Sequence, residues 1–231
     1  VSVFRSVQTD GLKKDDPARS DLTISGASVG LGRRLKWPDD FFTLYHEISF
    51  QNYALNQWSG TFLFTDGSSN NLSFQQTISR NSVDGFIWIR SGSQLSMTLQ
   101  LTPPFSLLDK KTDYATASYN VKYKWIEYHK WKFSGAWYKS LGKFVLYNKA
   151  QFGFLGYYNN DIGQSPFERF YLGGDGLSGY SLDGREIIAL RGYQNNSVTP
   201  KINGNTVGGT AYDKFTMELR FPISLNPSAT I

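Results

Sequence analysis

The sequence predicts an all-β protein, an antiparallel up-and-down transmembrane β-barrel, of which these 231 residues form about eight strands. Three observations predict it: a period-two alternation of apolar and polar residues, connections that are alternately long and short, and the composition. Aromatic residues make up 16% of the chain and charged residues only 19%, yet no apolar run is long enough for a membrane-spanning helix. Apolar residues spread out in this way are typical of barrel strands, although a soluble β-sandwich has a similar composition.

The alternation is clearest in the segments 93–101 and 211–222. In the second, Phe215, Met217, Leu219 and Phe221 share one face, and Lys214, Thr216, Glu218 and Arg220 share the other. Several strands exceed the roughly five or six residues usual in globular proteins, and roughly nine to eleven residues suit a tilted bilayer crossing. In chain order the predicted strands are 1–8, 22–36, 41–54, 71–81, 93–101, 119–125, 143–158 and 211–222.

The connections between these strands sort into two ends. In order they are 9–21, 37–40, 55–70, 82–92, 102–118, 139–142 and 159–210. Consecutive connections of an up-and-down barrel lie at opposite ends, so all the longer ones would share one end, as in outer-membrane barrels. Aromatic residues gather near the short turns, which predicts an interfacial girdle, with turn-proximal core packing as the alternative. They are Trp37, Phe41, Phe42, Phe86, Trp88, Trp137 and Tyr138.

The connection 159–210 is too long and too apolar for an ordinary loop. Its large apolar residues must be buried, and the interior of an eight-stranded barrel is already filled by its own side chains. We therefore expect a wider barrel, with this loop inserted into its lumen and with further strands outside this chain. Residues 1–231 would then be part of one barrel domain, with no second domain, and the middle of a longer protein. The apolar loop residues are Phe167, Phe170, Tyr171, Tyr180, Ile187, Ile188, Leu190 and Tyr193.

Two short motifs stand in this loop, FERFYLGGDG (167–176) and LRGYQN (190–195). The pair Gly173-Gly174 permits positive φ or close backbone approach. Arg191-Gly192-Tyr193 places a guanidinium beside a flexible residue and an aromatic ring. After the loop, Glu218 lies on the polar face of its strand, and a planar guanidinium is well suited to contact a carboxylate.

These residues resemble the BamA family of outer-membrane assembly factors and its wider insertase/translocase superfamily. That family has a Gly-Gly and an Arg-Gly-aromatic motif in a loop that folds back into the lumen, followed by a strand much like MELRFP. The turn DGFIWIRSGS (84–93) also resembles one of its periplasmic turns. The resemblance implies strands five to twelve of a sixteen-stranded barrel, preceded in the complete protein by periplasmic POTRA domains. It also implies that Arg191 pins the loop to the inward carboxylate Glu218.

Alternatives remain for both members of this pair. Arg185, in the insert between the two motifs, is a competing guanidinium for the loop motif. Glu218 could instead pair with a strand neighbour, Lys214 or Arg220. Arg191 could be an ordinary solvated loop residue.

The resemblance implies a protein of the Gram-negative outer membrane that folds and inserts other β-barrel proteins. Its expected partners are unfolded outer-membrane protein clients, accessory lipoproteins, and outer-membrane lipid with lipopolysaccharide. We expect no enzymatic reaction and no cofactor. The alternatives are a polypeptide-secreting translocase of the same superfamily and a passive porin. A soluble β-sandwich binding module is a further alternative, and an outer-membrane hydrolase is the weakest one.

Other chemistry has little support. The chain has no cysteine, and only His46 and His129 could serve as imidazole bases or metal ligands, so no metal site and no catalytic residue is expected. Each histidine is next to a glutamate, but neighbours on a strand point to opposite faces. The basic and aromatic stretch 119–133 could suggest a groove for single-stranded nucleic acid. Alternation separates Lys122 and Lys124 from the rings, however, so no nucleic-acid partner is expected.

Overall fold

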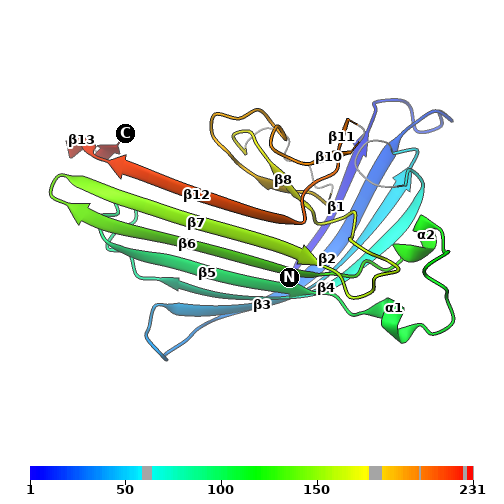
Figure 1. The fold of residues 1–231 in the computed structure, drawn as a ribbon, viewed down its shortest axis with the longest axis horizontal. Helices are drawn as coiled ribbons and strands as arrows, with labels where there is room; N and C mark the ends of the chain where they lie inside the picture. The colour runs from blue at the N-terminus through cyan, green and yellow to red at the C-terminus, as the bar shows by residue number, and fades with distance from the viewer. Residues whose placement is uncertain (59–63, 177–183, 203, 226–227, 231) are drawn as a thin grey trace.

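Eight long strands form one curved antiparallel sheet in the computed structural model, in the order β1-β2-β3-β4-β5-β6-β7-β12 (Figure 1). Strands β1 to β7 follow one another along the chain and pair with their sequence neighbours, which is the up-and-down arrangement predicted. β1 and β12 are the two edges, so the described strands form an open curved sheet and not a closed barrel. The structure describes residues 1–231 except 59–63, 177–183, 203, 226–227 and 231.

Seven strands of the wall match predicted segments, with ends that differ by a few residues. The wall strands are β1 (Ser2–Thr9), β2 (Asp21–Arg34), β3 (Phe42–Asn56), β4 (Gly67–Asn81), β5 (Gly92–Leu101), β6 (His129–Leu141), β7 (Phe144–Gly156) and β12 (Ala211–Arg220). Two helical turns, α1 (Phe105–Leu108) and α2 (Tyr119–Lys122), lie between β5 and β6. The short strands β8 (Phe170–Leu172), β9 (Glu186–Ile188), β10 (Lys201–Ile202) and β11 (Asn205–Thr206) lie between β7 and β12. The hairpin β13 (Pro222–Leu225) and β14 (Ser228–Thr230) follows β12.

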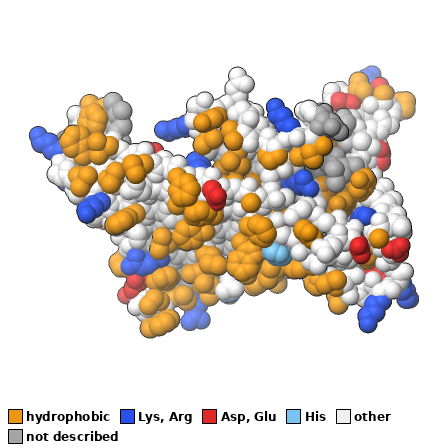
Figure 2. Space-filling view, viewed as in Figure 1, with side chains coloured by type: hydrophobic (Ala, Val, Ile, Leu, Met, Phe, Trp, Pro, Cys, Tyr) orange, Lys and Arg blue, Asp and Glu red, His pale blue; other side chains and the backbone are white. Residues whose placement is uncertain are grey.

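The period-two pattern describes the two faces of the sheet. On β12, Phe215 and Met217 are 71% and 76% exposed, whereas Tyr212 is buried and Glu218 is half-buried on the opposite face. On β6, Trp131, Phe133 and Trp137 are exposed, whereas Lys130, Ala136 and Tyr138 are buried. Figure 2 shows the resulting spread of hydrophobic side chains over the surface of the sheet. Apolar side chains thus cover the outer face, and polar or core-forming side chains the inner face.

One predicted strand is wrong. Segment 119–125 is not part of the wall: Tyr119–Lys122 form the helical turn α2, and Trp125 makes only an isolated bridge to Asn70. Because Tyr123, Ile126 and Tyr128 are buried in the core, the segment folds over the inner face and the wall strand begins only at His129. The long connection therefore spans 102–128. The inward lysines that alternate with outward rings are Lys130 and Lys132, and not Lys122 and Lys124 as predicted.

The sorting of the connections is confirmed in part. The connections 10–20, 57–66, 102–128 and 157–210 lie at one end of the sheet, and 35–41, 82–91 and 142–143 lie at the other. The connections of the first end are longer than their neighbours, except that 57–66 and 82–91 are equal in length. Near the short turns, Trp37 and Phe86 are 82% and 98% exposed and Trp137 is also exposed, so turn-proximal core packing does not account for them. Tyr138 and Trp88 differ, because they pack together with Val145 and Tyr147 on the inner face. No helix in the described part of the chain is long and apolar enough to cross a membrane.

We predict that Phe215→Lys destabilises the full-length protein much more than Thr216→Lys, its neighbour on the inner face, which lies opposite Lys149. A lysine on the outer face loses its hydration in the bilayer and costs about 2–4 kcal/mol near the midplane. The free energy of unfolding, from urea titration of the protein in lipid vesicles, measures the difference. Equal losses for the two variants would contradict the assignment of the faces.

Candidate functional site

The segment between β7 and β12 folds back onto the concave face of the sheet (Figure 1). β8 and β9 pair in parallel, and Phe170 bridges to Gly209 just before β12. Phe167 and Phe170 are fully buried; their rings lie 4.7 Å from Tyr53 on β3 and 4.8 Å from Tyr212 on β12. The core therefore lies between this inner loop, residues 157–210, and the inner face of the wall. Of the predicted apolar loop residues, Tyr180 lies outside the described residues.

Lys130 on β6 is the charged residue at the centre of this contact. Its side chain is only 1% exposed, and its Nζ lies 3.0 Å from Glu168 Oε2 and 2.6 Å from Glu186 Oε2. The same ammonium lies 5.0 Å from the centre of the Phe170 ring, close enough for a cation–π contact. A buried ammonium requires such partners, because its desolvation is costly unless a counter-charge lies beside it. The inner loop supplies both carboxylates.

Lys132, the next inward residue of β6, shares one of these carboxylates. Its Nζ lies 3.1 Å from Glu186 Oε1. Burial alone would raise the pKa of the Glu186 carboxyl, but the charges of Lys130 and Lys132 outweigh burial and lower that pKa below its usual value. Glu186 is therefore held ionised between two lysines of the wall.

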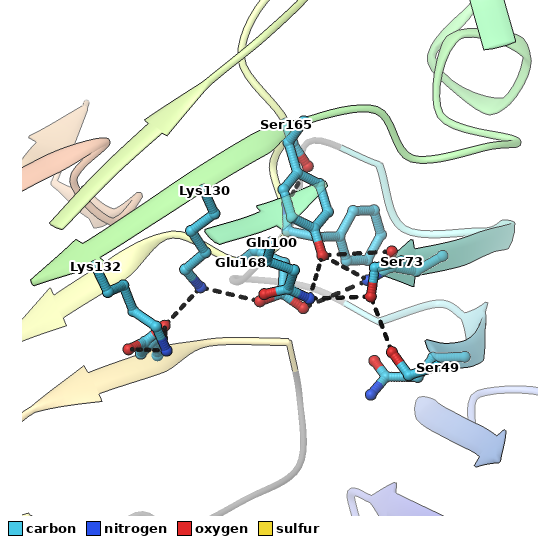
Figure 3. A network of polar contacts seen from close by, with 12 residues as sticks. Ser49, Ser73, Gln100, Lys130, Lys132, Ser165 and Glu168 are labelled. Carbon is cyan, nitrogen blue, oxygen red and sulfur yellow. Dashed lines mark hydrogen bonds and ion pairs between the residues drawn. The ribbon is translucent and has the colours of Figure 1, made fainter. Parts of the chain in front are cut away.

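Glu168 connects the ion pairs to a polar network on the inner wall (Figure 3). Asn71 on β4 lies 3.5 Å from Glu168 Oε1, and its side chain also donates to the hydroxyl of Tyr128 at 3.2 Å. Gln100 on β5 donates to the same hydroxyl and to Ser73, which in turn contacts Ser49 on β3. The network therefore extends from β3 to β6 and ends at the inner loop. Networks of this kind stabilise one geometry when every buried polar group finds a partner.

The backbone at Glu168 is in an uncommon conformation. Its φ is +64°, in the left-handed region that few residues other than glycine adopt. Its N–H donates to the carbonyl of Gly184 at 2.7 Å, and the carbonyl of Arg169 accepts from Glu186 N at 3.0 Å. Residues in this conformation persist where their surroundings hold them, often at functional sites. Here the conformation aims the carboxylate at Lys130.

Arg169 holds the base of the inner loop from the other side. Its guanidinium donates to the carbonyls of Ser165 at 2.7 Å, Val207 at 3.3 Å and Gln164 at 3.4 Å. Burial lowers the pKa of Arg169. The side chain thus bridges the first and last parts of the loop without a carboxylate partner among these contacts.

The structure brings the two predicted loop motifs together. Gly173 N donates to Ile188 O at 3.1 Å and Gly174 N donates to Tyr193 O at 2.9 Å. Both glycines have positive φ, and a Cβ at either position would collide with the segment that follows Tyr193. The Gly-Gly pair therefore permits close packing of the two strands of the motif, as its sequence indicates. Arg191, Gly192 and Tyr193 are exposed and line an open cavity of about 650 Å³ with Gly174, Asp175, Gln194 and Asn195.

The predicted pair Arg191–Glu218 is not formed in this structure. Glu218 does lie on the inner face, but its Oε2 contacts Arg220 of the same strand, at 2.6 Å from Nη2. Arg220 also lies 4.0 Å from the ring centre of Tyr147 on β7. These contacts are near the short-turn end, whereas the inner loop lies further along the wall, where Lys214 donates to Ala189 O at 2.5 Å. Of the alternatives, Arg220 is therefore the partner of Glu218, and Arg185 lies over the ring of Tyr171.

The residues that hold the inner loop were missed in the sequence. Lys130 and Lys132 lie in the run HKWKF, which directly follows the segment predicted as a strand. Glu168 lies within the first loop motif, and Glu186 lies between the two motifs. The available signal was two inward lysines on one strand and two acidic residues in an apolar loop. No group of three or more His, Asp or Glu side chains in the described ranges is placed to share a metal ion.

We predict that Lys130→Met detaches the inner loop and lowers the free energy of unfolding by about 3–5 kcal/mol, the usual cost of removing one partner from a buried pair. Lys132→Met should cost only about 1 kcal/mol, because Lys132 is 32% exposed and Glu186 keeps Lys130. Urea titration measures stability, and limited proteolysis within 157–210 measures detachment. Glu218→Gln is the control for the pair near the short turns and should leave the loop protected.

We predict that acidification releases the inner loop in the wild-type protein. The pKa of Glu186 is lowered in the folded state, so its contribution is complete above its usual value of 4.5 and is lost as the pH falls through the lowered pKa. Proteolysis with an acid-active protease between about pH 5 and pH 2 tests this. Glu186→Gln removes the titrating group, and an unchanged pH profile in that variant would contradict the assignment.

Comparison with known proteins identifies the family. A model of the Omp85 superfamily domain matches residues 1–231. Among solved structures, the fold is similar to BamA from Haemophilus ducreyi lacking POTRA domains 1–3, with a TM-score of 0.64 and 16% sequence identity. That similarity covers 95% of this chain and 41% of the BamA chain, so this chain spans less than half the length of that relative. No curated protein sequence matches this chain significantly. The curved sheet is part of the wall of an outer-membrane β-barrel, and the chain belongs to the Omp85 superfamily.

Proposed function

We propose that this chain is the central wall and inner loop of an outer-membrane insertase, which folds other β-barrel proteins and inserts them into the Gram-negative outer membrane. The observation that carries the proposal is the inner loop held on the concave face by Lys130, Glu168 and Glu186. The family match supports it, because the Omp85 superfamily comprises insertases and translocases. The role of BamA itself comes to this chain only through the similarity in fold.

A held inner loop favours an insertase over a passive porin. A porin needs an open aqueous lumen for diffusion. Here Phe167 and Phe170 are fully buried between the loop and the wall, so opening that part of the lumen would expose two large rings and separate Lys130 from both carboxylates. The proposed role of the loop is to brace the wall while clients are assembled elsewhere on the barrel.

A secretion translocase of the same superfamily is the second candidate. It would pass an unfolded polypeptide through the lumen, which requires the inner loop to leave its place. The exposed cavity around Arg191 and Tyr193 favours this candidate, because it leaves the outer part of the motif open to a polypeptide. The ion pairs at Lys130 favour the insertase, because they must break for each passage.

The partners follow from the proposed function. Unfolded outer-membrane proteins would be the clients and accessory lipoproteins the other subunits, in a membrane that contains lipopolysaccharide. Client strands would pair with an exposed strand edge of the complete barrel, where N–H and C=O groups are free. No covalent chemistry is part of this proposal.

The test uses the full-length protein in proteoliposomes, with an unfolded outer-membrane protein added outside. We expect the client to fold into the same membrane, which is measured by its heat-modifiable migration in electrophoresis, and we expect low single-channel conductance. Client protected inside the vesicles without membrane insertion would indicate the translocase instead. A large, steady conductance would indicate a porin and contradict the insertase.

A further inference from the structure

On two strands, β2 and β6, the outward row of apolar side chains ends near a short turn in a cation that is unpaired among the described residues. On β2 the outward residues Val29 and Leu31 are followed by Arg33, and on β6 the outward Trp137 is followed by Lys139. Lys36 and Lys143 lie in the adjoining turns and are exposed. These four residues, Arg33, Lys36, Lys139 and Lys143, are here called the basic rim. Figure 2 shows Lys and Arg side chains toward the left end of the molecule, where β6 and β7 join.

The basic rim has no ion pair within the described part of the chain, although acidic residues lie close by in sequence. Asp39 is paired with Arg80 at 2.9 Å. Asp84 accepts from Arg90 N at 2.9 Å and from Ser91 Oγ at 3.0 Å, which occupies it within its own turn. Only Asp40 in these turns is an exposed acid outside these contacts. The four cations are therefore left in excess at this end.

Exposed aromatic rings lie beside the basic rim. Trp37 follows Lys36, and Trp137 is the outward neighbour of Lys139. Aromatic rings favour the headgroup zone of a bilayer, and the long aliphatic parts of lysine and arginine can lie along apolar surface while the charge reaches the headgroups. Because Arg33 and Lys139 continue the outward apolar rows, they face the lipid and not the lumen.

The other end of the same rows differs in charge. Toward the long loops, the outward residues carry charges of both signs: Arg5 on β1, which lies opposite Ser25, Asp21 on β2, which pairs with Arg19, and Asp213 on β12. A general need for polarity at the edges of the apolar band does not explain this asymmetry. We propose that the basic rim binds the headgroups of anionic phospholipids in the leaflet that meets the short turns.

The test measures which lipid surrounds the full-length protein. Vesicles of phosphatidylcholine contain the protein and a trace of spin-labelled phosphatidylglycerol or spin-labelled phosphatidylcholine, and electron spin resonance gives the relative association constant of the two labels. We expect the wild-type protein to prefer phosphatidylglycerol by about twofold or more, since each cation near an anionic headgroup adds to the attraction. In about 1 M salt, where charges are screened within about 3 Å, the preference should disappear.

The matched variants place the effect on the basic rim. Lys139→Gln with Lys143→Gln should reduce the preference by about half, and the fourfold variant with Arg33→Gln and Lys36→Gln should abolish it. Lys110→Gln with Lys111→Gln removes two exposed charges from the long-loop end and should leave the preference unchanged. No preference in the wild-type protein, or one that survives in the fourfold variant or in high salt, would overturn the proposal. An equal loss in the control would overturn it as well. The salt titration of the wild-type protein tests the proposal even if a variant fails to fold.

Discussion

The position of the inner loop depends on one buried lysine. Lys130 projects from the wall into a core where water cannot reach it, and both of its counter-charges come from the loop. Glu168 and Glu186 are eighteen positions apart in the numbering, so a single ammonium holds two separate parts of the loop against one strand. The loop then buries Phe167 and Phe170 against β3 and β12. The ring contacts and the ion pairs form together, because both need the loop in the same position. Charge pairing and apolar burial are therefore one structural unit here.

The two faces of the wall meet different surroundings. Its outer face must be apolar because lipid cannot hydrate charge, and its inner face can be polar because it meets the loop and the lumen. The consequence is a protein with many exposed rings and a core on the concave side, in which tyrosines such as Tyr53, Tyr128 and Tyr212 serve as core residues. Tyrosine suits that face, since its ring packs and its hydroxyl can join the polar network.

Two groups of inward charges among the described residues lie apart from each other. Near the short turns, the half-exposed Glu218 and Arg220 pair beside the buried ring of Tyr147 on the neighbouring strand. Further along the wall, Lys130 and Lys132 hold the loop. The family resemblance implies a contact between Arg191 and Glu218, but Glu218 lies near the short turns and the inner loop lies further along the wall. Residues two apart on a strand share a face, so Arg220 lies beside Glu218.

The sequence by itself determined seven of the eight wall strands and their two faces, because a strand in lipid must alternate at every second residue. It also determined that the loop must be buried, since exposing aromatic residues such as Phe167 and Phe170 to water is unfavourable in free energy. Only the tertiary structure decided where the wall strand after β5 begins, because residues 119–125 alternate as strand residues do, although Tyr123 packs in the core from a connection. It alone decided which charges meet: ion pairing depends on distances in space between β6 and the loop, and these distances are not encoded in local spacing along the chain.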